Sequence, residues 1–188
     1  MAKFDLNDSS VVCIIGSGAG GGTLGNELAQ KGIKVVCLEA GPRLKLDDIK
    51  NDFLGMFGKL SWLDSREGTG QLDAGLPAWI CKVVGGTTVH WAGASLRFQP
   101  HEFKARTTYG QIDGANLLDF PITYDDLADY YTKAENKMGT TGTGGRARLP
   151  GNNNYKVLEY GARKMGYKEV HTGNMSINSK PYDGRPEC

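Results

Sequence analysis

Two short apolar runs near the start of the chain each predict a buried β-strand. The first run covers residues 11–15 (VVCII) and the second covers residues 34–38 (KVVCL). Both are rich in β-branched residues and show no polar alternation, which is typical of parallel strands covered on both faces. Cys13 and Cys37 lie inside these runs, so we expect both thiols to pack in the core.

The residues between the two runs predict an α-helix. Leu24 and Leu28 fall on one face of a helix over residues 23–31, and Gly32 stands where a C-terminal cap is typical. Strand, helix and strand in this order predict a βαβ unit with a parallel sheet. The predicted fold class is therefore α/β.

Two more helices are predicted in the second half of the chain. The first follows Thr123, a typical N-cap, and stops at Gly139, and the second covers residues 155–165 and is closed by Gly166. We expect their apolar residues to form buried faces: Leu127, Tyr131, Ala134 and Met138 in the first helix, and Val157, Leu158, Ala162 and Met165 in the second.

Residues 44–62 also place apolar positions at helical spacing, and the pattern leaves two interpretations open. The segment either covers a site at the start of the chain or docks as a surface helix on another part of the protein. Residues 64–75 and 140–154 are polar and rich in glycine, so we expect an exposed loop at 64–75 and a long surface loop or linker at 140–154.

The first apolar run ends in a Gly-x-Gly-x-x-Gly motif made by Gly16, Gly18 and Gly21, with Ala19 and Gly20 inside it. We expect Gly16 to make a tight turn, Gly18 to let the backbone approach a phosphate, and Gly21 to let the helix pack close to the strand. Because a helix N-terminus attracts anions, the motif predicts a pyrophosphate-binding turn.

An acidic residue follows the second strand at the distance typical of ribose recognition. This residue is Glu39, and Ala40 comes after it. A carboxylate accepts hydrogen bonds from ribose hydroxyls and repels a 2′-phosphate. Glu39 therefore favours a cofactor with a free adenosine ribose and disfavours NADP.

A second glycine-rich segment follows the apolar residues 78–84. Gly85, Gly86, Thr87 and Thr88 offer backbone N–H groups and two hydroxyls, which could face a phosphate from the opposite side. The two glycine-rich segments therefore predict one extended dinucleotide cofactor held between them.

The next residues are suited to a planar ring. His90 supplies an imidazole, Trp91 a flat aromatic side chain, and Ala92 and Gly93 are small enough to let a ring lie close to the backbone.

Composition narrows the class of protein. The 188 residues carry a net charge of +1 from 22 basic and 21 acidic side chains spread along the chain, which excludes nucleic acid as a partner. The start of the chain does not resemble a secretory leader, and no apolar run reaches the about 20 residues of a membrane span, so we expect a cytoplasmic protein without a direct span. Its 4 cysteines are too few for a disulfide framework and predict no metal site.

Three segments together resemble the glucose-methanol-choline (GMC) family of FAD-dependent oxidoreductases. They are IGSGAGG (residues 15–21), EAGP (residues 39–42) and VGGTTVHWAG (residues 84–93). Within that family they are most similar to bacterial sugar and gluconate dehydrogenase large subunits. The resemblance continues through FPITYDDL (residues 120–127), which opens a helix in such proteins.

The resemblance implies a two-part organisation. Residues 1–100 would form a Rossmann-like FAD-binding segment, and residues 101–188 would form connecting helices and the start of an incomplete substrate domain. The chain would then be the N-terminal portion of such an enzyme. Cys188 stands where related dehydrogenases enter a cysteine-containing segment, which in some of them holds an iron–sulfur cluster.

The resemblance also implies residue roles. Gly16, Gly18 and Gly21 would contact the ADP pyrophosphate, Glu39 the adenine ribose, and Gly85, Gly86, Thr87 and Thr88 the region of the pyrophosphate and flavin. His90 lies where relatives with a His-Trp pair attach the flavin covalently. The alternative is that His90 only packs on the ring or hydrogen-bonds to it.

The implied reaction is oxidation of the CH–OH group of a sugar, aldonate or other alcohol by hydride transfer to flavin N5. The resemblance implies that the catalytic base belongs to a His-Asn or His-His pair in a C-terminal half outside this chain, and His101 and His171 stand in poor contexts to replace it. Thr87-Thr88 and His90-Trp91 replace the Ser-Ser and Asn of many alcohol-oxidising members, which argues against a choline or methanol substrate.

The resemblance further implies partners: a small hydroxylated substrate, a small subunit and a cytochrome electron acceptor. A partner that carries an export signal would place the enzyme in the periplasm. Two other functions stay open, namely another FAD- or NAD-dependent oxidoreductase, and a stand-alone nucleotide-binding module without catalysis.

Overall fold

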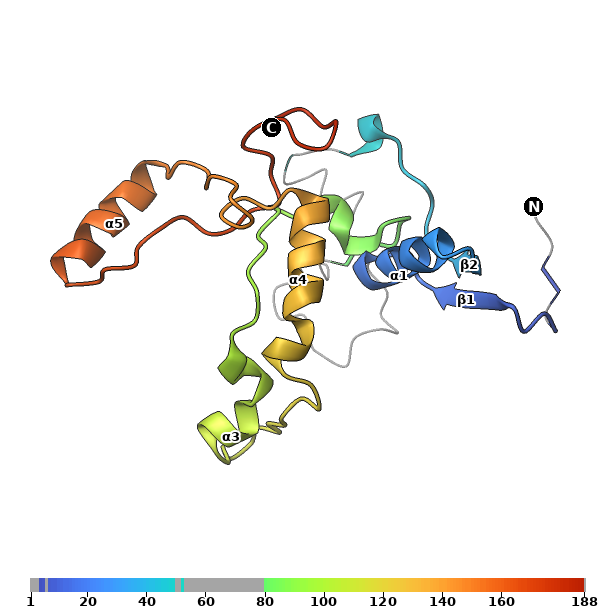
Figure 1. Cartoon of the computed structure of the whole chain (residues 1–188), viewed down its shortest axis with the longest axis horizontal. Helices are drawn as coiled ribbons and strands as arrows, with labels where there is room; N and C mark the ends of the chain where they lie inside the picture. The colour runs from blue at the N-terminus through green and yellow to red at the C-terminus, as the bar shows by residue number, and fades with distance from the viewer. Residues whose placement is uncertain (1–3, 6, 50–51, 53–79, 188) are drawn as a thin grey trace. The chain divides into compact units, whose positions relative to one another are not determined.

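A computed structural model describes residues 4–5, 7–49, 52 and 80–187 of the chain (Figure 1). The chain divides into two compact units, Met1–Trp91 and Ala92–Cys188. The described residues of the first unit form β1 (Val11–Ile15), α1 (Ala19–Gln30), β2 (Lys34–Leu38) and the 3₁₀ turns η1 (Leu46–Asp48) and η3 (Gly86–His90). The second contains the 3₁₀ turn η4 (Pro100–Phe103) and the helices α3 (Ala105–Tyr109), α4 (Tyr124–Met138) and α5 (Asn153–Lys164).

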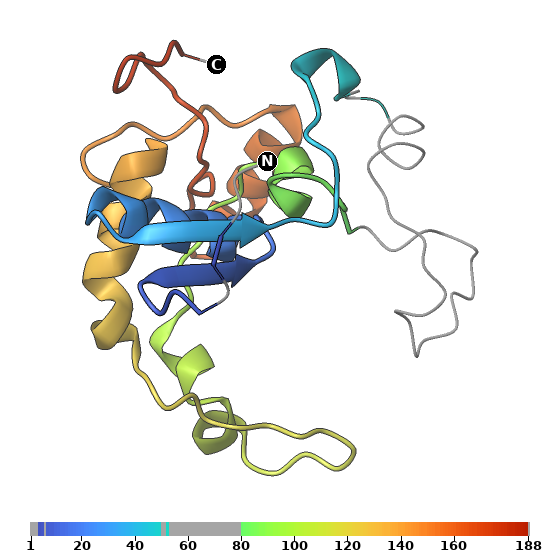
Figure 2. The same ribbon diagram turned by 90° about the vertical axis from the view of Figure 1, so that its right-hand side faces the viewer.

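The two predicted strands form one parallel sheet. β1 and β2 lie side by side (Figure 2), paired from Val11 opposite Lys34 to Ile15 opposite Leu38. Their bounds are those that the apolar runs predict, so the strand prediction is confirmed. The order β1, α1, β2 gives the α/β class expected from the sequence.

Helix α1 packs on this sheet through glycines. A Cβ on Gly25 would be 3.4 Å from the Ile14 side chain, and Ile14 is buried. The helix begins at Ala19, four residues earlier than predicted, because the glycine-rich residues after Gly18 are already helical. It ends at Gln30, one residue before the predicted end, with Lys31 at the C-cap position and Gly32 following at a φ of +76°.

Much of the sheet's apolar surface is exposed. Ile15 is 87% exposed and Leu38 55% exposed, and both Cys13 and Cys37 are exposed. The prediction that these two thiols pack in the core is therefore wrong. A strand is buried on both faces only when a layer covers each face, and α1 is the described helix that packs on both strands. Cys81 is buried, and burial raises the pKa of its thiol.

Helix α4 confirms its predicted ends. Thr123 caps it through a reciprocal pair of hydrogen bonds with Asp126, and Gly139 ends it with a φ of +72°. Its inner face differs from the apolar pattern, however, because Ala134 is exposed and Glu135 is buried.

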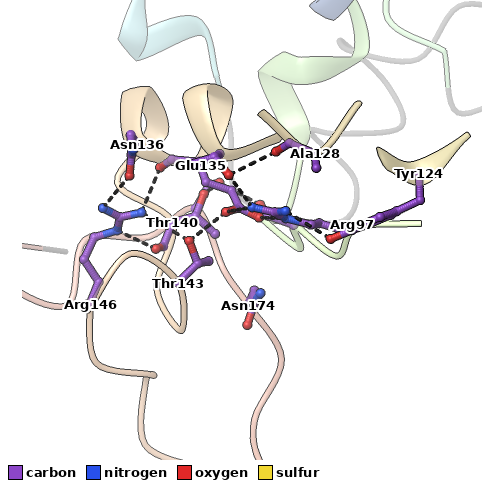
Figure 3. Close-up of polar contacts among 12 residues, drawn as sticks. Arg97, Tyr124, Ala128, Glu135, Asn136, Thr140, Thr143, Arg146 and Asn174 are labelled. Carbon is purple, nitrogen blue, oxygen red and sulfur yellow. Dashed lines mark hydrogen bonds and ion pairs between the residues drawn. The ribbon is translucent and has the colours of Figure 1, made fainter. Parts of the chain in front are cut away.

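Glu135 is buried because it takes part in a polar cluster (Figure 3). Its carboxylate accepts two hydrogen bonds of 2.7 Å from the Arg97 guanidinium, and one of 2.7 Å from Thr143. The hydrogen bond from Arg97 is the main cause that lowers the pKa of Glu135. Arg146 lies on the other side and donates to the Thr140 carbonyl over 2.7 Å. This cluster forms the polar core of the second unit.

The loop after α4 is less exposed than predicted. Thr140 and Thr141 are fully buried, and the backbone N of Thr141 donates to the Met175 carbonyl over 2.8 Å. Arg148 donates to the Thr172 carbonyl over 2.7 Å. Residues 140–148 are therefore a structural part of the second unit rather than a surface linker.

Helix α5 has an N-cap at Asn152 and spans the predicted region, but its predicted inner face is exposed. Val157, Leu158 and Met165 are 73%, 67% and 77% exposed. The prediction of a buried face is therefore wrong for these three residues, because amphipathic spacing does not itself supply a surface to pack on.

Part of the predicted segment 44–62 can be compared with the structure. Residues 46–48 form η1, and Leu44 and Ile49 pack beside the buried Cys81 and Val83. The rest of the predicted helix, residues 50–51 and 53–62, lies outside the described residues, as does the predicted loop 64–75.

Candidate functional site

The first glycine turn, residues 16–21, connects β1 to α1. Gly16 has a φ of +89° and its backbone N donates to the Leu38 carbonyl over 2.7 Å, which closes the turn against β2. A Cβ on Gly21 would lie 2.0 Å from the carbonyl oxygen of Gly16. The tight turn and the close helix packing expected of these two glycines are therefore confirmed.

The start of α1 is suited to bind an anion. Its N-cap is Gly18, no side chain caps it, and its first turn holds no acidic residue. A Cβ added at Gly18 or Gly20 would meet nothing within 4 Å, so the space beside the turn is open. The first N–H groups of a helix have no partner inside the helix, and together with the helix dipole they favour a negative group at this position.

Glu39 lies at the end of β2 and is fixed against the first glycine turn. Its Oε2 accepts hydrogen bonds from the Ser17 hydroxyl over 2.6 Å and from the Ser17 backbone N over 2.9 Å. Its Oε1 accepts one from the Gly41 backbone N over 2.9 Å. These bonds, with the Ser17 hydroxyl the largest cause, lower the pKa of Glu39 to about 2. The carboxylate is therefore ionised at neutral pH and remains able to accept hydrogen bonds from further hydroxyls.

The second glycine segment, residues 85–88, lies against the first. Gly85 and Gly86 have φ values of +96° and +57°, a conformation that glycine adopts with least strain. A Cβ on Gly86 would be 3.2 Å from the Cα of Gly18. The structure therefore brings together the two glycine-rich segments that the sequence places 68 residues apart.

The hydroxyls of this segment are used inside the chain. Thr88 donates through its hydroxyl to the Gly85 carbonyl, and the Thr87 hydroxyl accepts from the Cys81 backbone N over 3.4 Å. We expected both hydroxyls to face a phosphate, whereas in the structure each has a partner within the chain. The backbone N–H groups of the two glycines are also used inside the chain, since Gly85 donates to the Ser17 hydroxyl over 2.9 Å and Gly86 to the Val83 carbonyl over 2.8 Å.

Gly41 holds the second segment in place. A Cβ at Gly41 would lie 2.0 Å from the Lys82 carbonyl oxygen, so only glycine fits at this crossing. The backbone N of Val84 donates to the Pro42 carbonyl over 3.0 Å. The residues after β2 thus bring the chain before Gly85 alongside the end of β2, near Glu39. The sequence pattern gave no sign of this contact.

The remaining candidate residues divide between the two units. His90 is half-buried with its Nε2 shielded from solvent, and Trp91 is 44% exposed. Ala92 is exposed and belongs to the second unit. Gly93, also in that unit, is buried, and its carbonyl accepts from the Ser176 backbone N over 2.7 Å.

The other two histidines are exposed. His101 lies in η4, and His171 has its Nδ1 3.1 Å from the Thr172 carbonyl oxygen. Within the described ranges, no three His, Cys, Asp or Glu side chains are grouped as a metal site would require. No helix in the same part of the chain has the length and apolar character needed to cross a membrane.

Comparison with known proteins finds relatives of this chain, whereas no family model matches it. The chain is 31% identical to the fructose dehydrogenase large subunit of Gluconobacter japonicus, with 96% of the chain and 39% of the relative covered. It is 30% identical to the 6'''-hydroxyparomomycin C oxidase of Streptomyces lividus, over 94% of the chain and 33% of the relative. It is 28% identical to the gluconate 2-dehydrogenase flavoprotein of Pantoea cypripedii, over 69% of the chain and 25% of the relative. The chain thus spans well under half the length of each of these relatives.

Proposed function

We propose that this chain is a GMC-type oxidoreductase and supplies the FAD-binding part of such an enzyme. The observation that carries the proposal is the close approach of Gly86 to Gly18, which sets two glycine-rich backbones against each other beside an ionised carboxylate. That combination fits a dinucleotide, which has two phosphates and a ribose with free hydroxyls.

The described residues fit this cofactor. The space beside Gly16 and Gly18 is open, and the uncapped start of α1 offers N–H groups to a pyrophosphate. Glu39 would accept hydrogen bonds from the adenosine ribose and exclude a 2′-phosphate. Gly85 and Gly86 would contact the pyrophosphate from the second side. When bound, FAD supplies the hydride acceptor, and the role of these residues is to hold and orient it.

The reaction that we propose for the complete enzyme is oxidation of a CH–OH group in a sugar, aldonate or other alcohol. The names of the relatives support this choice, since they include enzymes of fructose, of gluconate and of 6'''-hydroxyparomomycin C. One relative is named a large subunit, so we extend the proposal to a multi-subunit enzyme with a small subunit and a cytochrome acceptor.

His90 follows the second glycine segment after one residue, Val89, and we propose that it lies at the flavin. Covalent attachment and simple ring contact make different predictions for denatured protein. If His90 is bonded to the flavin, acid precipitation of the flavin-loaded enzyme leaves the yellow colour in the pellet, and His90→Ala moves it to the supernatant. If His90 only contacts the ring, the colour is in the supernatant for both proteins.

Calorimetric titration of the full chain with ADP tests the nucleotide site. We expect ADP to bind and FAD to compete with it, because both carry the ribose and pyrophosphate. We expect 2′-phospho-ADP-ribose to bind at least about tenfold more weakly, because its phosphate would meet the Glu39 carboxylate. Glu39→Ala should weaken ADP binding, whereas Asp129→Asn, an exposed acid on α4, should leave it unchanged.

The proposal fails if a folded chain binds none of these ligands. It also fails if the 2′-phosphorylated ligand binds as well as ADP, since this would remove the proposed role of Glu39. Circular dichroism of each variant establishes that it is folded before binding is compared.

A further inference from the structure

Ser17 is the central residue in a chain of hydrogen bonds that joins three segments of the first unit. Its hydroxyl donates to Oε2 of Glu39 over 2.6 Å, at the end of β2. The same hydroxyl oxygen accepts a hydrogen bond of 2.9 Å from the backbone N of Gly85, in the second glycine segment. Glu39 and Gly85 therefore share one atom as a hydrogen-bond partner.

The chemistry of a hydroxyl suits this position. A hydroxyl has one proton to donate and lone pairs to accept, and Ser17 uses one of each. Donation to an ionised carboxylate polarises the O–H bond, which makes the oxygen a better acceptor for the next donor. The charge on Glu39 thus strengthens the bond from Gly85. Alanine would remove both bonds, whereas threonine would keep the hydroxyl.

We infer that Ser17 is a positioning residue that couples the carboxylate of Glu39 to the second glycine segment. The nucleotide side of this inference rests on the proposed function, in which Glu39 meets the ribose and Gly85 the pyrophosphate. The coupling between Glu39 and Gly85 is a property of the chain itself and exists without a nucleotide. Binding of the ribose by Glu39 and positioning of Gly85 at the pyrophosphate would therefore occur together.

Amide hydrogen exchange at Gly85 measures this coupling. The rate is followed by NMR on the full chain, first without nucleotide and then with saturating ADP. The variants are Ser17→Ala, Ser17→Thr, Glu39→Ala and the double variant with both alanines. Ser10→Ala is the matched control, because its hydroxyl also donates to a carboxylate, that of Asp8, before the start of β1.

Without nucleotide, we expect Ser17→Ala to speed exchange at Gly85 about tenfold, the usual effect of losing one hydrogen bond. Glu39→Ala should speed it by a smaller factor, because the bond from Gly85 to Ser17 remains but is weaker. The double variant should exchange no faster than Ser17→Ala, because both substitutions act through the same bond. Ser17→Thr and Ser10→Ala should exchange at about the wild-type rate. With ADP, exchange at Gly85 should slow in the wild type and slow much less in Ser17→Ala.

The inference is overturned if Glu39→Ala leaves exchange at Gly85 unchanged, or if the two alanine substitutions multiply in the double variant. Should Ser17→Ala fail to fold, the Glu39→Ala and Ser17→Thr proteins still decide the question. Failure of ADP to bind the wild type would overturn the proposed function alone, because the nucleotide-free rates test the coupling separately.

Discussion

Gly21 in the first turn of α1 lies so close to Gly16 at the end of β1 that a Cβ on Gly21 would be 2.0 Å from the Gly16 carbonyl oxygen. The obstacle is backbone and cannot rotate away. The third glycine of the motif is therefore required by the packing of helix on strand, whether or not a ligand is bound.

Substitution of Gly21 by alanine should destabilise the first unit by about 2 kcal/mol or more, because α1 must move off the strand to admit the methyl group. Gly20→Ala is the matched control in the same helix. A Cβ there meets nothing within 4 Å, and alanine favours the helix by up to about 1 kcal/mol. Urea unfolding followed by circular dichroism compares the two, and equal stability of both variants would contradict the packing argument.

Glu39 should give the chain a distinct acid sensitivity. Its pKa of about 2 in the folded state lies below the ordinary value of 4.5. The ionised carboxylate therefore contributes stability that is fully present above about pH 4.5 and is lost as the pH falls toward about 2. Glu39→Gln should be less stable than the wild type at neutral pH, and the difference should shrink across this acid range.

Urea midpoints measured between neutral pH and about pH 3 test this expectation. Asp129→Asn serves as the control, since Asp129 is exposed on α4. A difference between wild type and Glu39→Gln that stays constant with pH would show that the carboxylate is not stabilised by its hydrogen bonds.

The pair of Arg97 and Glu135 should dominate the stability of the second unit. The Glu135 side chain is 6% exposed, so Arg97→Ala leaves a buried carboxylate without its main partner. We expect Arg97→Ala to lower the free energy of unfolding by about 3 kcal/mol, and the double variant with Glu135→Ala to lower it by a smaller additional amount.

Arg163 and Glu159 on α5 provide the matched comparison, as an exposed pair with the same 2.7 Å separation. Alanine at either position of this pair should lower the free energy of unfolding by about 0.5 kcal/mol or less, because water screens the charges. Chemical denaturation of the single and double variants gives both coupling energies. Equal values for the two pairs would argue against burial as the source of the difference.

The cap of α4 should contribute measurably to the same unit. Thr123 accepts from the Asp126 backbone N, and Asp126 accepts from the Thr123 backbone N over 2.8 Å. Thr123→Ala should lower the free energy of unfolding by about 1 kcal/mol, and Thr123→Ser should restore most of it. If alanine and serine are equally destabilising, the side chain does not act as a cap.

Features set by neighbouring residues could be predicted from the sequence. The strands at residues 11–15 and 34–38 have the predicted bounds, because β-branched apolar runs and the flanking glycines are local signals. The ends of α4 were equally readable, since Thr123 and Gly139 carry the chemistry of a cap and a stop.

Features that depend on distant partners could not be predicted. Glu135 interrupts an apolar stripe and is buried only because Arg97, 38 residues away, reaches it. Nothing in the sequence around Ser17 indicated a role for its side chain. That role depends on hydrogen bonds with Glu39 and Gly85, which lie 22 and 68 residues further along the chain. Periodicity shows which face of an element is apolar, but it does not show whether another layer covers that face.

The exposed apolar surface of the sheet affects how this chain can be handled. Ile15 and Leu38 are 87% and 55% exposed, and among the described residues β1 and β2 pair with no further strand. Unpaired strands and exposed apolar side chains favour association with other molecules. The purified chain should therefore bind to hydrophobic resins and increase the fluorescence of dyes such as ANS. Its light scattering should rise with concentration, as expected for aggregation. Dilute samples and a mild detergent are the conditions under which its chemistry can be studied.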